Sequence, residues 1–267
     1  MLIANDITVQ LGHRTILSNV NFNAQPGTVT AIVGPNGSGK TTLLRALSGD
    51  VDYSGQVLLN GCDTRQLKSW ELAAERAVLP QASTLAFPFT VIEVVRIGLQ
   101  SGTSGETDSV AMQALNLVGL PHYANRFFQE LSGGEQQRVQ LARVLAQVWD
   151  PVLDGTPRWL LLDEPVASLD IGHQLQIMDI ARNFAHAGGG VITVMHDLNL
   201  TALYADSVAV LAHGSVLAHD SPMQVMTDAI LSKAYECSVK VNTPPPSGFT
   251  YLLPHSAGLA TVSQDSL

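Results

Sequence analysis

The chain has 267 residues, of which 46% are hydrophobic and 14% charged, so it can bury a sizeable core. Its uninterrupted apolar runs, such as 159–162, are far shorter than the roughly 18 residues that a membrane-spanning helix requires. The formal net charge is −9 and no run of lysines or arginines occurs, which argues against a nucleic-acid partner, because binding a phosphate backbone needs clustered cations.

The two cysteines and the first residues of the chain bear on its compartment. Cys62 and Cys237 lie far apart in the sequence and have no metal-ligand spacing, so we expect ordinary buried or reduced thiols of a cytoplasmic protein. The opening residues, MLIANDITVQLG, have no basic segment ahead of an apolar stretch, and no signal peptide is therefore expected.

The first part of the chain alternates β-like runs with turns. Strands are expected at ITVQL, TILSNVNF and TVTAIV, and the last of them leads through a glycine-rich loop into a helix over 40–48 that Gly49 closes. Further strands are expected at 56–59 and 77–79. These early strands predict an antiparallel β subdomain at the N-terminus.

Residues 85–157 change character and predict a helical insertion. Helical patterns at 91–99 and 108–118 precede the sequence LSGGE, which opens another helix. In that helix apolar residues recur at helical spacing and polar residues make the opposite face. The two faces are Leu141, Val144, Leu145 and Val148 against Gln136, Gln140, Arg143 and Gln147.

The rest of the chain again alternates strands with helices. A turn-rich stretch at 150–157 precedes a strand over 158–163, a helix near 171–187 and a strand over 191–195. This order predicts an α/β fold with a mostly parallel sheet covered by helices on both faces. The expected division is a core from 1–84 and 158–240, a helical subdomain from 85–157, and a tail from 241–267 with a small hairpin and a disordered end.

The glycine-rich loop GPNGSGKTT matches the phosphate-loop pattern G-x-x-x-x-G-K-[ST] at every defined position, after a strand and before a helix. Its backbone N–H groups would curl around a β-phosphate, Lys40 would reach the β- and γ-phosphates, and the Thr41 hydroxyl would ligate Mg²⁺. The sequence thus predicts a P-loop NTPase core. The expected ATP-binding residues of the loop are Gly34, Pro35, Asn36, Gly37, Ser38, Gly39, Lys40, Thr41 and Thr42.

Two carboxylates end the apolar strand LLLDE, and a histidine follows the next strand. Ligands bind at the carboxyl edge of open α/β sheets, so Asp163 would hold Mg²⁺, directly or through water, and Glu164 would orient and deprotonate the attacking water. His196 would lie at the same edge, within reach of the γ-phosphate. On the pattern alone, a structural role for His196 is equally consistent.

The order of these motifs resembles the ATPase subunits of ABC transporters over nearly the whole chain. The phosphate loop, Gln81, LSGGE at 131–135, LLLDE, Ser168-Leu169-Asp170 and His196 occur in the order of that family. LSGGE is the specific element, since most phosphate-loop enzymes lack it. The resemblance implies an ABC ATPase fold and Mg²⁺-dependent ATP hydrolysis.

The resemblance also implies a role for the second glycine turn. In this family two copies dimerise head to tail, and each ATP lies between the phosphate loop of one and the LSGGE turn of the other. By that likeness Asp170 would lie at the dimer seam. Gln81 would contact the γ-phosphate and Mg²⁺ and connect them to the helical insertion, which grips the transmembrane subunits. The residues facing the partner's ATP would be Ser132, Gly133, Gly134 and Glu135.

One position departs from the family pattern. An aromatic residue near the first strand usually stacks on adenine, and the matching position here is Leu11, with His13 nearby. Adenine stacking by an aromatic side chain is therefore not expected at this position.

The stretch LPQASTLAFPFTVIEVVRIG at 79–98 and the segment DPVLDGTPRW resemble ATPase subunits of haem (hemin) importers, within the group that serves iron–siderophores and cobalamin. This implies a peripheral subunit on the cytoplasmic face of the bacterial inner membrane, with two permease subunits and, indirectly, a periplasmic binding protein. Phe87 and Phe89 would either pack the helical insertion or contact a membrane subunit. The alternatives are a cobalamin or iron–siderophore importer and, in another class, a soluble ABC ATPase of iron–sulfur assembly, which co-purification with a membrane protein would distinguish.

Overall fold

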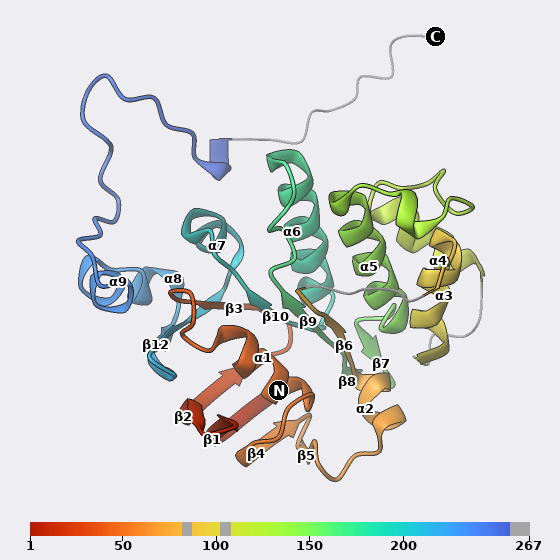
Figure 1. The fold of residues 1–267 in the computed structure, drawn as a ribbon, viewed down its shortest axis with the longest axis horizontal. Coiled ribbons are helices and arrows are strands. Elements are labelled where there is room, and N and C mark those ends of the chain that lie inside the picture. The colour runs from red at the N-terminus through yellow and green to blue at the C-terminus, as the bar shows by residue number, and fades with distance from the viewer. Residues whose placement is uncertain (82–86, 102–107, 257–267) are drawn as a thin grey trace.

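The computed structural model describes residues 1–81, 87–101 and 108–256 and arranges them in two main β-sheets with helices around the larger one (Figure 1). The smaller sheet is antiparallel, with the order β2-β1-β4-β5. Buried and exposed residues roughly alternate along its long strands, as expected when one face of a sheet is covered. Its strands are β1 (Leu2–Leu11), β2 (Arg14–Ala24), β4 (Ser54–Leu59) and β5 (Cys62–Asp63). The predicted N-terminal antiparallel subdomain is thus confirmed.

The larger sheet has the order β12-β11-β3-β10-β9-β6 and is parallel except for β12, which pairs antiparallel with β11. Every residue of β3, β9 and β10 is buried, which explains why these strands read as continuous apolar runs. The strands are β3 (Val29–Val33), β6 (Arg76–Leu79), β9 (Trp159–Asp163), β10 (Gly190–Val194), β11 (Ser207–Ala212) and β12 (Ser215–Asp220).

Helix α1 (Lys40–Ser48) lies between the two sheets. Gly49, with φ of 78°, ends the helix in the left-handed conformation that glycine adopts without a steric penalty, as predicted. The leucines of α1 join a buried cluster that also contains residues from both sheets, among them Phe22 of β2 and Leu161 of β9. Packing on both sides holds α1, and with it the loop that precedes it, against the ends of the central strands.

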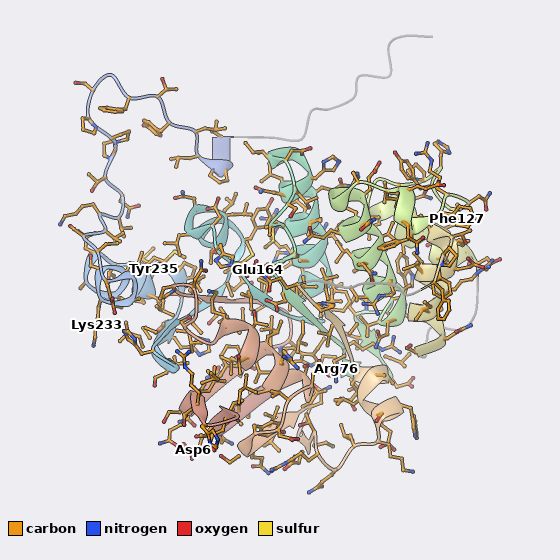
Figure 2. All side chains as sticks on the ribbon, in the orientation of Figure 1. Asp6, Arg76, Phe127, Glu164, Lys233 and Tyr235 are labelled. Carbon is orange, nitrogen blue, oxygen red and sulfur yellow. The ribbon has the colours of Figure 1, made fainter. Side chains whose placement is uncertain are left out.

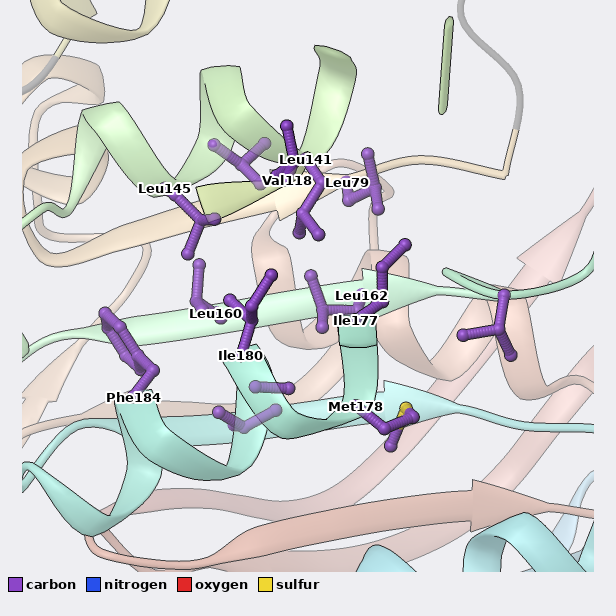
Figure 3. Close-up of a cluster of buried hydrophobic side chains, with 14 of the residues drawn as sticks. Leu79, Val118, Leu141, Leu145, Leu160, Leu162, Ile177, Met178, Ile180 and Phe184 are labelled. Carbon is purple, nitrogen blue, oxygen red and sulfur yellow. The ribbon is translucent and has the colours of Figure 1, made fainter. Parts of the chain in front are cut away.

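The opposite face of the larger sheet is covered by α6 (Ile171–His186) and α7 (Leu198–Tyr204). In Figure 3, Leu160 and Leu162 of β9 face side chains of α6 such as Ile180, and Leu145 of the helical subdomain joins the same cluster. One continuous apolar core therefore connects the sheet with the helical subdomain. The remaining helices outside that subdomain are α2 (Ser69–Glu75), α8 (Pro222–Val225) and α9 (Asp228–Tyr235), with a short helix η2 (Pro254–Ser256) in the tail.

The helical subdomain packs beside the larger sheet (Figure 1). It contains α3 (Val91–Ser101), α4 (Asp108–Leu117), the short helix η1 (Phe128–Glu130) and α5 (Gly133–Gln147). Helices α3 and α5 cross so closely that a Cβ at Gly98 would overlap the carbonyl oxygen of Arg143. Phe89 packs against the core, whereas Phe87 is 69% exposed.

Neighbouring backbone covers part of the polar face of α5. Gln140 and Gln147 are buried, and Gln147 Nε2 donates to the carbonyl oxygens of Ala73 and Arg76 at 2.8 and 3.0 Å. Helical periodicity cannot tell a solvent-facing polar stripe from one that neighbouring backbone covers. The turn-rich stretch 150–157 contains a two-stranded hairpin of β7 (Val152–Leu153) and β8 (Thr156–Pro157).

One expectation requires correction, and it concerns the tail. No strand occurs among the described residues after β12, so the hairpin expected within 241–267 is absent from the part up to residue 256. The prolines at 244–246 lack the N–H donors of a strand ladder. The expected disorder at the end of the chain falls on residues outside the described ranges. Within those ranges no helix is long and apolar enough to cross a membrane.

Candidate functional site

The phosphate loop connects β3 with α1 at the carboxyl edge of the larger sheet. A Cβ at Gly34 would overlap the carbonyl oxygen of Leu211, so the loop passes against the neighbouring strand β11 at this point. Lys40 is the first residue of α1, and its Nζ donates to the carbonyl oxygens of Gly34 and Pro35 at 2.9 and 3.0 Å. Burial lowers the pKa of this lysine, while the nearby carboxylates of Glu164 and Asp163 oppose that shift. The loop thus holds a cation at its centre.

Thr41 and Asp163 meet where the start of α1 approaches the end of β9. The Thr41 hydroxyl donates to Asp163 Oδ1 at 3.2 Å, and Asp163 is only 3% exposed. Burial raises the pKa of Asp163, and the charge of Glu164 acts in the same direction, against the hydrogen bond from Thr41 and the charges of Lys40 and His196. A buried carboxylate beside a hydroxyl offers the hard oxygen ligands that Mg²⁺ prefers.

No group of three or more His, Cys, Asp or Glu side chains in the described ranges could hold a metal ion. Magnesium is usually bound through one or two carboxylates together with phosphate oxygens of a substrate. Thr41 and Asp163 fit that mode of binding, and a fully protein-enclosed metal site is not needed for it.

Glu164 follows β9 and turns its carboxylate toward two other polar side chains. Gln81 Nε2 donates to Glu164 Oε2 at 3.0 Å, and His196 Nε2 lies 2.5 Å from Glu164 Oε1. Gln81 comes shortly after β6 and His196 shortly after β10, and these strands flank β9 in the sheet. Three neighbouring parallel strands therefore bring the three side chains to one edge, as the sequence predicts for Glu164 and His196. Glu164 lies near the middle of the molecule (Figure 2).

A cavity of about 410 Å³ opens in front of this edge. It combines the phosphate loop with the polar cluster and with two residues of β2. Its lining residues are Arg14, Ile16, Asn36, Gly37, Gly39, Lys40, Thr41, Thr42, Gln81, Glu164 and His196. The cavity brings together most of the residues that the motifs single out for ATP.

Arg14 and Ile16 are cavity residues that the motifs did not reveal. Leu11 and His13, which align with the usual adenine-stacking position, are absent from the described residues that line the cavity, and Leu11 is 47% exposed. Strand β2 passes directly against the phosphate loop, since a Cβ at Gly39 would meet the Leu17 side chain at 2.7 Å. The available signal is the pattern of β2 itself: Arg14 and Ile16 stand two residues apart and therefore project from the same face of the strand.

The LSGGE turn begins α5. Ser132 is the N-cap, and Glu135 Oε2 accepts hydrogen bonds from Ser132 N at 2.8 Å and Ser132 Oγ at 2.7 Å. These hydrogen bonds, first from the hydroxyl and then from the backbone, lower the pKa of Glu135 to about 2. A Cβ at Gly133 would meet nothing within 4 Å, whereas one at Gly134 would contact the Leu169 side chain. The turn is thus a rigid, capped helix start with one open glycine.

The described lining of the cavity in the same chain does not include this turn. Among the described residues that line the cavity there is none from 131–135. Asp170 likewise lies elsewhere, as the N-cap of α6, where it accepts hydrogen bonds from His173 N at 3.0 Å and His173 Nδ1 at 2.8 Å. Its carboxylate is 69% exposed.

Comparisons with known proteins show the family of the chain. Residues 17–167 match the family model of ABC transporters. The chain is 64% identical over 256 residues to the hemin import ATP-binding protein HmuV of Roseobacter denitrificans, which covers 96% of this chain and 98% of the relative. It is 53% identical over 261 residues to the protein of the same name from Mesorhizobium japonicum, covering 96% and 99% of the two chains.

Solved structures agree on the fold. A dimeric bacterial ABC transporter cassette has a TM-score of 0.73 at 28% identity, covering 83% of this chain and 99% of that one. An ATP-binding subunit of an ABC transporter has a TM-score of 0.74 at 21% identity, covering 84% and 91%. The latter shows likeness of fold alone.

Proposed function

Since the chain belongs to the ABC transporter family, we propose that it is the ATP-hydrolysing subunit of a hemin importer. The proposal of ATP hydrolysis rests on the position of Glu164. Its carboxylate lies between Gln81 and His196 at the wall of the cavity that the phosphate loop lines. The proposal of hemin as the transported substrate rests on relatives named as hemin import ATP-binding proteins, which are 52–64% identical over almost the full chain.

ATP would bind with its phosphates in the loop from Gly34 to Thr42. Lys40 supports this because its ammonium is already at the centre of the loop, where it can exchange its backbone acceptors for β- and γ-phosphate oxygens. Thr41 and Asp163, with the amide oxygen of Gln81, would hold Mg²⁺. When bound, the ion would neutralise charge on the phosphate oxygens.

Hydrolysis would use the polar cluster. Glu164 would take a proton from the attacking water as the water oxygen bonds to the γ-phosphorus and the bond from that phosphorus to the bridging oxygen of ADP breaks. His196 would hold one carboxylate oxygen and reach the γ-phosphate, and Gln81 would hold the other. His196 and Gln81 would thus orient the carboxylate of Glu164 toward a single position in the cavity.

The LSGGE turn would act on the nucleotide of a second copy of the chain. Residues 131–135 are absent from the described lining of the cavity and a Cβ at Gly133 would meet nothing within 4 Å, which supports this proposal, because an exposed helix N-terminus is suited to a phosphate that arrives from outside. The dimeric cassette among similar structures supports pairing of two copies. Asp170, exposed at the start of α6, would lie at the seam.

The nucleobase would lie against Arg14 and Ile16. A guanidinium plane can stack on an aromatic ring, and an isoleucine side chain offers an apolar surface beside it. This assignment replaces Leu11 at the adenine site, since Arg14 and Ile16 line the cavity.

The chain would act at the cytoplasmic face of the inner membrane with two permease subunits, and indirectly with a periplasmic binding protein that delivers hemin. Phe87 supports a contact with a membrane subunit, because it is 69% exposed beside the helical subdomain. A first test is the ATPase reaction itself: the purified chain with its permease should release ADP and phosphate only when Mg²⁺ is present. Unchanged hydrolysis after chelation of divalent ions would contradict the proposal.

A further inference from the structure

The side chain of Gln137 joins helix α5 to the backbone of Glu164. Gln137 lies in the second helical turn of α5. Its Nε2 donates to the backbone carbonyl oxygen of Glu164 at 3.0 Å. Gln137 belongs to the helical subdomain and Glu164 to the core, and 27 residues separate them. The contact is partly buried, and it touches the backbone of the residue that we propose as the general base.

The backbone of Glu164 is held in an unusual conformation. Its φ is 51°, in the left-handed region that non-glycine residues adopt infrequently and that surrounding contacts must maintain. Glu164 N donates to the Val194 carbonyl oxygen at 3.2 Å, and the Glu164 carbonyl oxygen accepts from Ala167 N at 3.3 Å as well as from Gln137. Of these three hydrogen bonds, two join backbone groups of the core. The third comes from the Gln137 side chain, in the helical subdomain.

A second contact links the same helix end to the segment after Glu164. A Cβ at Gly134 would come within 3.0 Å of Leu169 Cδ2 and 3.7 Å of the Ser168 carbonyl oxygen. The first two turns of α5 therefore rest on residues 164–169 at two separate points. A small shift of the helical subdomain would change both contacts together.

We propose that Gln137 is a positioning residue for hydrolysis: helix α5 of each chain holds the left-handed backbone of Glu164 in the same chain, and so orients the Glu164 carboxylate. This inference rests on the proposed role of Glu164 as the base. It gives the helical subdomain a connection to the base in its own chain in addition to the one through Gln81. Movement of the subdomain against the membrane subunits would then change the rate of hydrolysis without changing the phosphate loop.

The chain offers a matched control at a similar junction. Gln176 Nε2 donates to the Leu117 carbonyl oxygen at 3.0 Å and so also joins the core to the helical subdomain, at a junction that does not involve Glu164. Gln136 is a further comparison, because its side chain bonds to the carbonyl oxygens of Phe128 and Leu131 within the subdomain. If Gln137 acted only as a structural tie, changes at Gln137 and Gln176 would have similar effects.

The test uses the full chain with its permease and compares steady-state ATPase kinetics of Gln137→Ala, Gln137→Glu and Gln176→Ala. Loss of the hydrogen bond should lower kcat by about 10- to 100-fold, the range expected when a catalytic group is slightly misplaced, and leave the KM for ATP within about twofold. Gln137→Glu keeps the size of the side chain but puts an acceptor against the carbonyl oxygen, so it should lose at least as much. Gln176→Ala should leave kcat within about twofold of the unchanged protein.

A double substitution separates this inference from the proposed function. In a Glu164→Gln background, Gln137→Ala should cause no further loss of kcat, because the base through which Gln137 acts is gone. An equal loss in both backgrounds would overturn the inference, and so would a normal kcat for both Gln137 variants. Loss of the ATP-bound dimer in the double variant would also overturn it, since Gln137 would then act through the LSGGE turn on the partner's nucleotide. A normal kcat for Glu164→Gln alone would instead refute the proposed role of Glu164.

Discussion

His196 Nε2 and Glu164 Oε1 lie 2.5 Å apart although 32 residues separate them in the chain. The contact exists because β9 and β10 are adjacent and parallel, with Val194 opposite Asp163, so that the residues just after the two strands meet at one edge. The relationship supports a single catalytic unit in place of two independent polar residues. It also places His196 in the lining of the cavity and outside the apolar core.

Removing the base should slow hydrolysis selectively. Glu164→Gln keeps the shape of the side chain but cannot take a proton, and we expect kcat to fall by on the order of 10²–10⁴. ATP should still bind, and an ATP-bound dimer should accumulate in size-exclusion chromatography. Glu236→Gln is the control, because Glu236 is 71% exposed and pairs with His213 away from the cavity lining. A normal kcat for Glu164→Gln would contradict the assignment.

Removing the phosphate-loop cation should act earlier, on binding. Lys40→Ala takes away the ammonium at the centre of the loop, so most affinity for ATP should be lost, as measured by fluorescent-nucleotide titration. The matched control is Lys233→Ala, since Lys233 is exposed on α9 at the periphery of the molecule (Figure 2). Normal binding by the Lys40 variant would mean that the nucleotide does not use this loop.

A charge in the LSGGE turn should act on the partner. Gly133→Asp would place a carboxylate where the partner's γ-phosphate is expected, and two like charges about 4 Å apart at an effective dielectric constant of about 20 repel by roughly 4 kcal/mol. Hydrolysis should fail while the monomer still binds ATP. Gly133→Ala is the comparison for ATP binding by the monomer, which it should leave unchanged because a Cβ there meets nothing within 4 Å of the same chain.

Mixing two inactive variants gives the sharper form of this test. In a mixed dimer of a Gly133→Asp chain with a Lys40→Ala chain, one ATP site contains both substitutions and the other ATP site contains neither. Some ATPase activity should return if one intact site suffices. Weak ATP binding by the Gly133→Asp monomer would instead assign the turn to the chain's own nucleotide.

Arg14 should tune nucleotide affinity and base preference. Arg14→Ala removes a cation from the cavity wall, and a stacking contribution of about 0.5–2 kcal/mol would correspond to roughly a 2- to 30-fold rise in the KM for ATP. Preference for ATP over other nucleoside triphosphates should weaken at the same time. Leu11→Ala and His13→Ala should change the KM little, and the reverse outcome would return the adenine site to the position of the family pattern.

The nucleotide motifs could be predicted because each is a short contiguous pattern with its own flanking elements. The phosphate loop between a strand and a helix, and the carboxylates after LLLD, bring their structural context with them. The alternation of strands and helices likewise predicts the parallel sheet, because fully buried strands read as apolar runs.

Contacts between distant segments could not be predicted in this way. Arg14 reaches the cavity only because β2 lies against the phosphate loop, and Gln137 reaches Glu164 only because α5 packs on the core. Gln140 and Gln147 show the same limit, since their polarity suggests exposure while neighbouring backbone buries them. Each of these roles depends on which elements become neighbours, and a local pattern does not contain that information.

The central claim is that this chain powers hemin import, and its most direct test is uptake in a strain that lacks it. Cells carrying the unchanged gene should grow with hemin as sole iron source and accumulate hemin, whereas the deletion strain and a Glu164→Gln strain should not. Cobalamin and siderophore uptake should be normal in all three strains. Normal hemin accumulation in the deletion strain, together with loss of cobalamin or siderophore uptake, would contradict the claim and assign the subunit to a sister transporter.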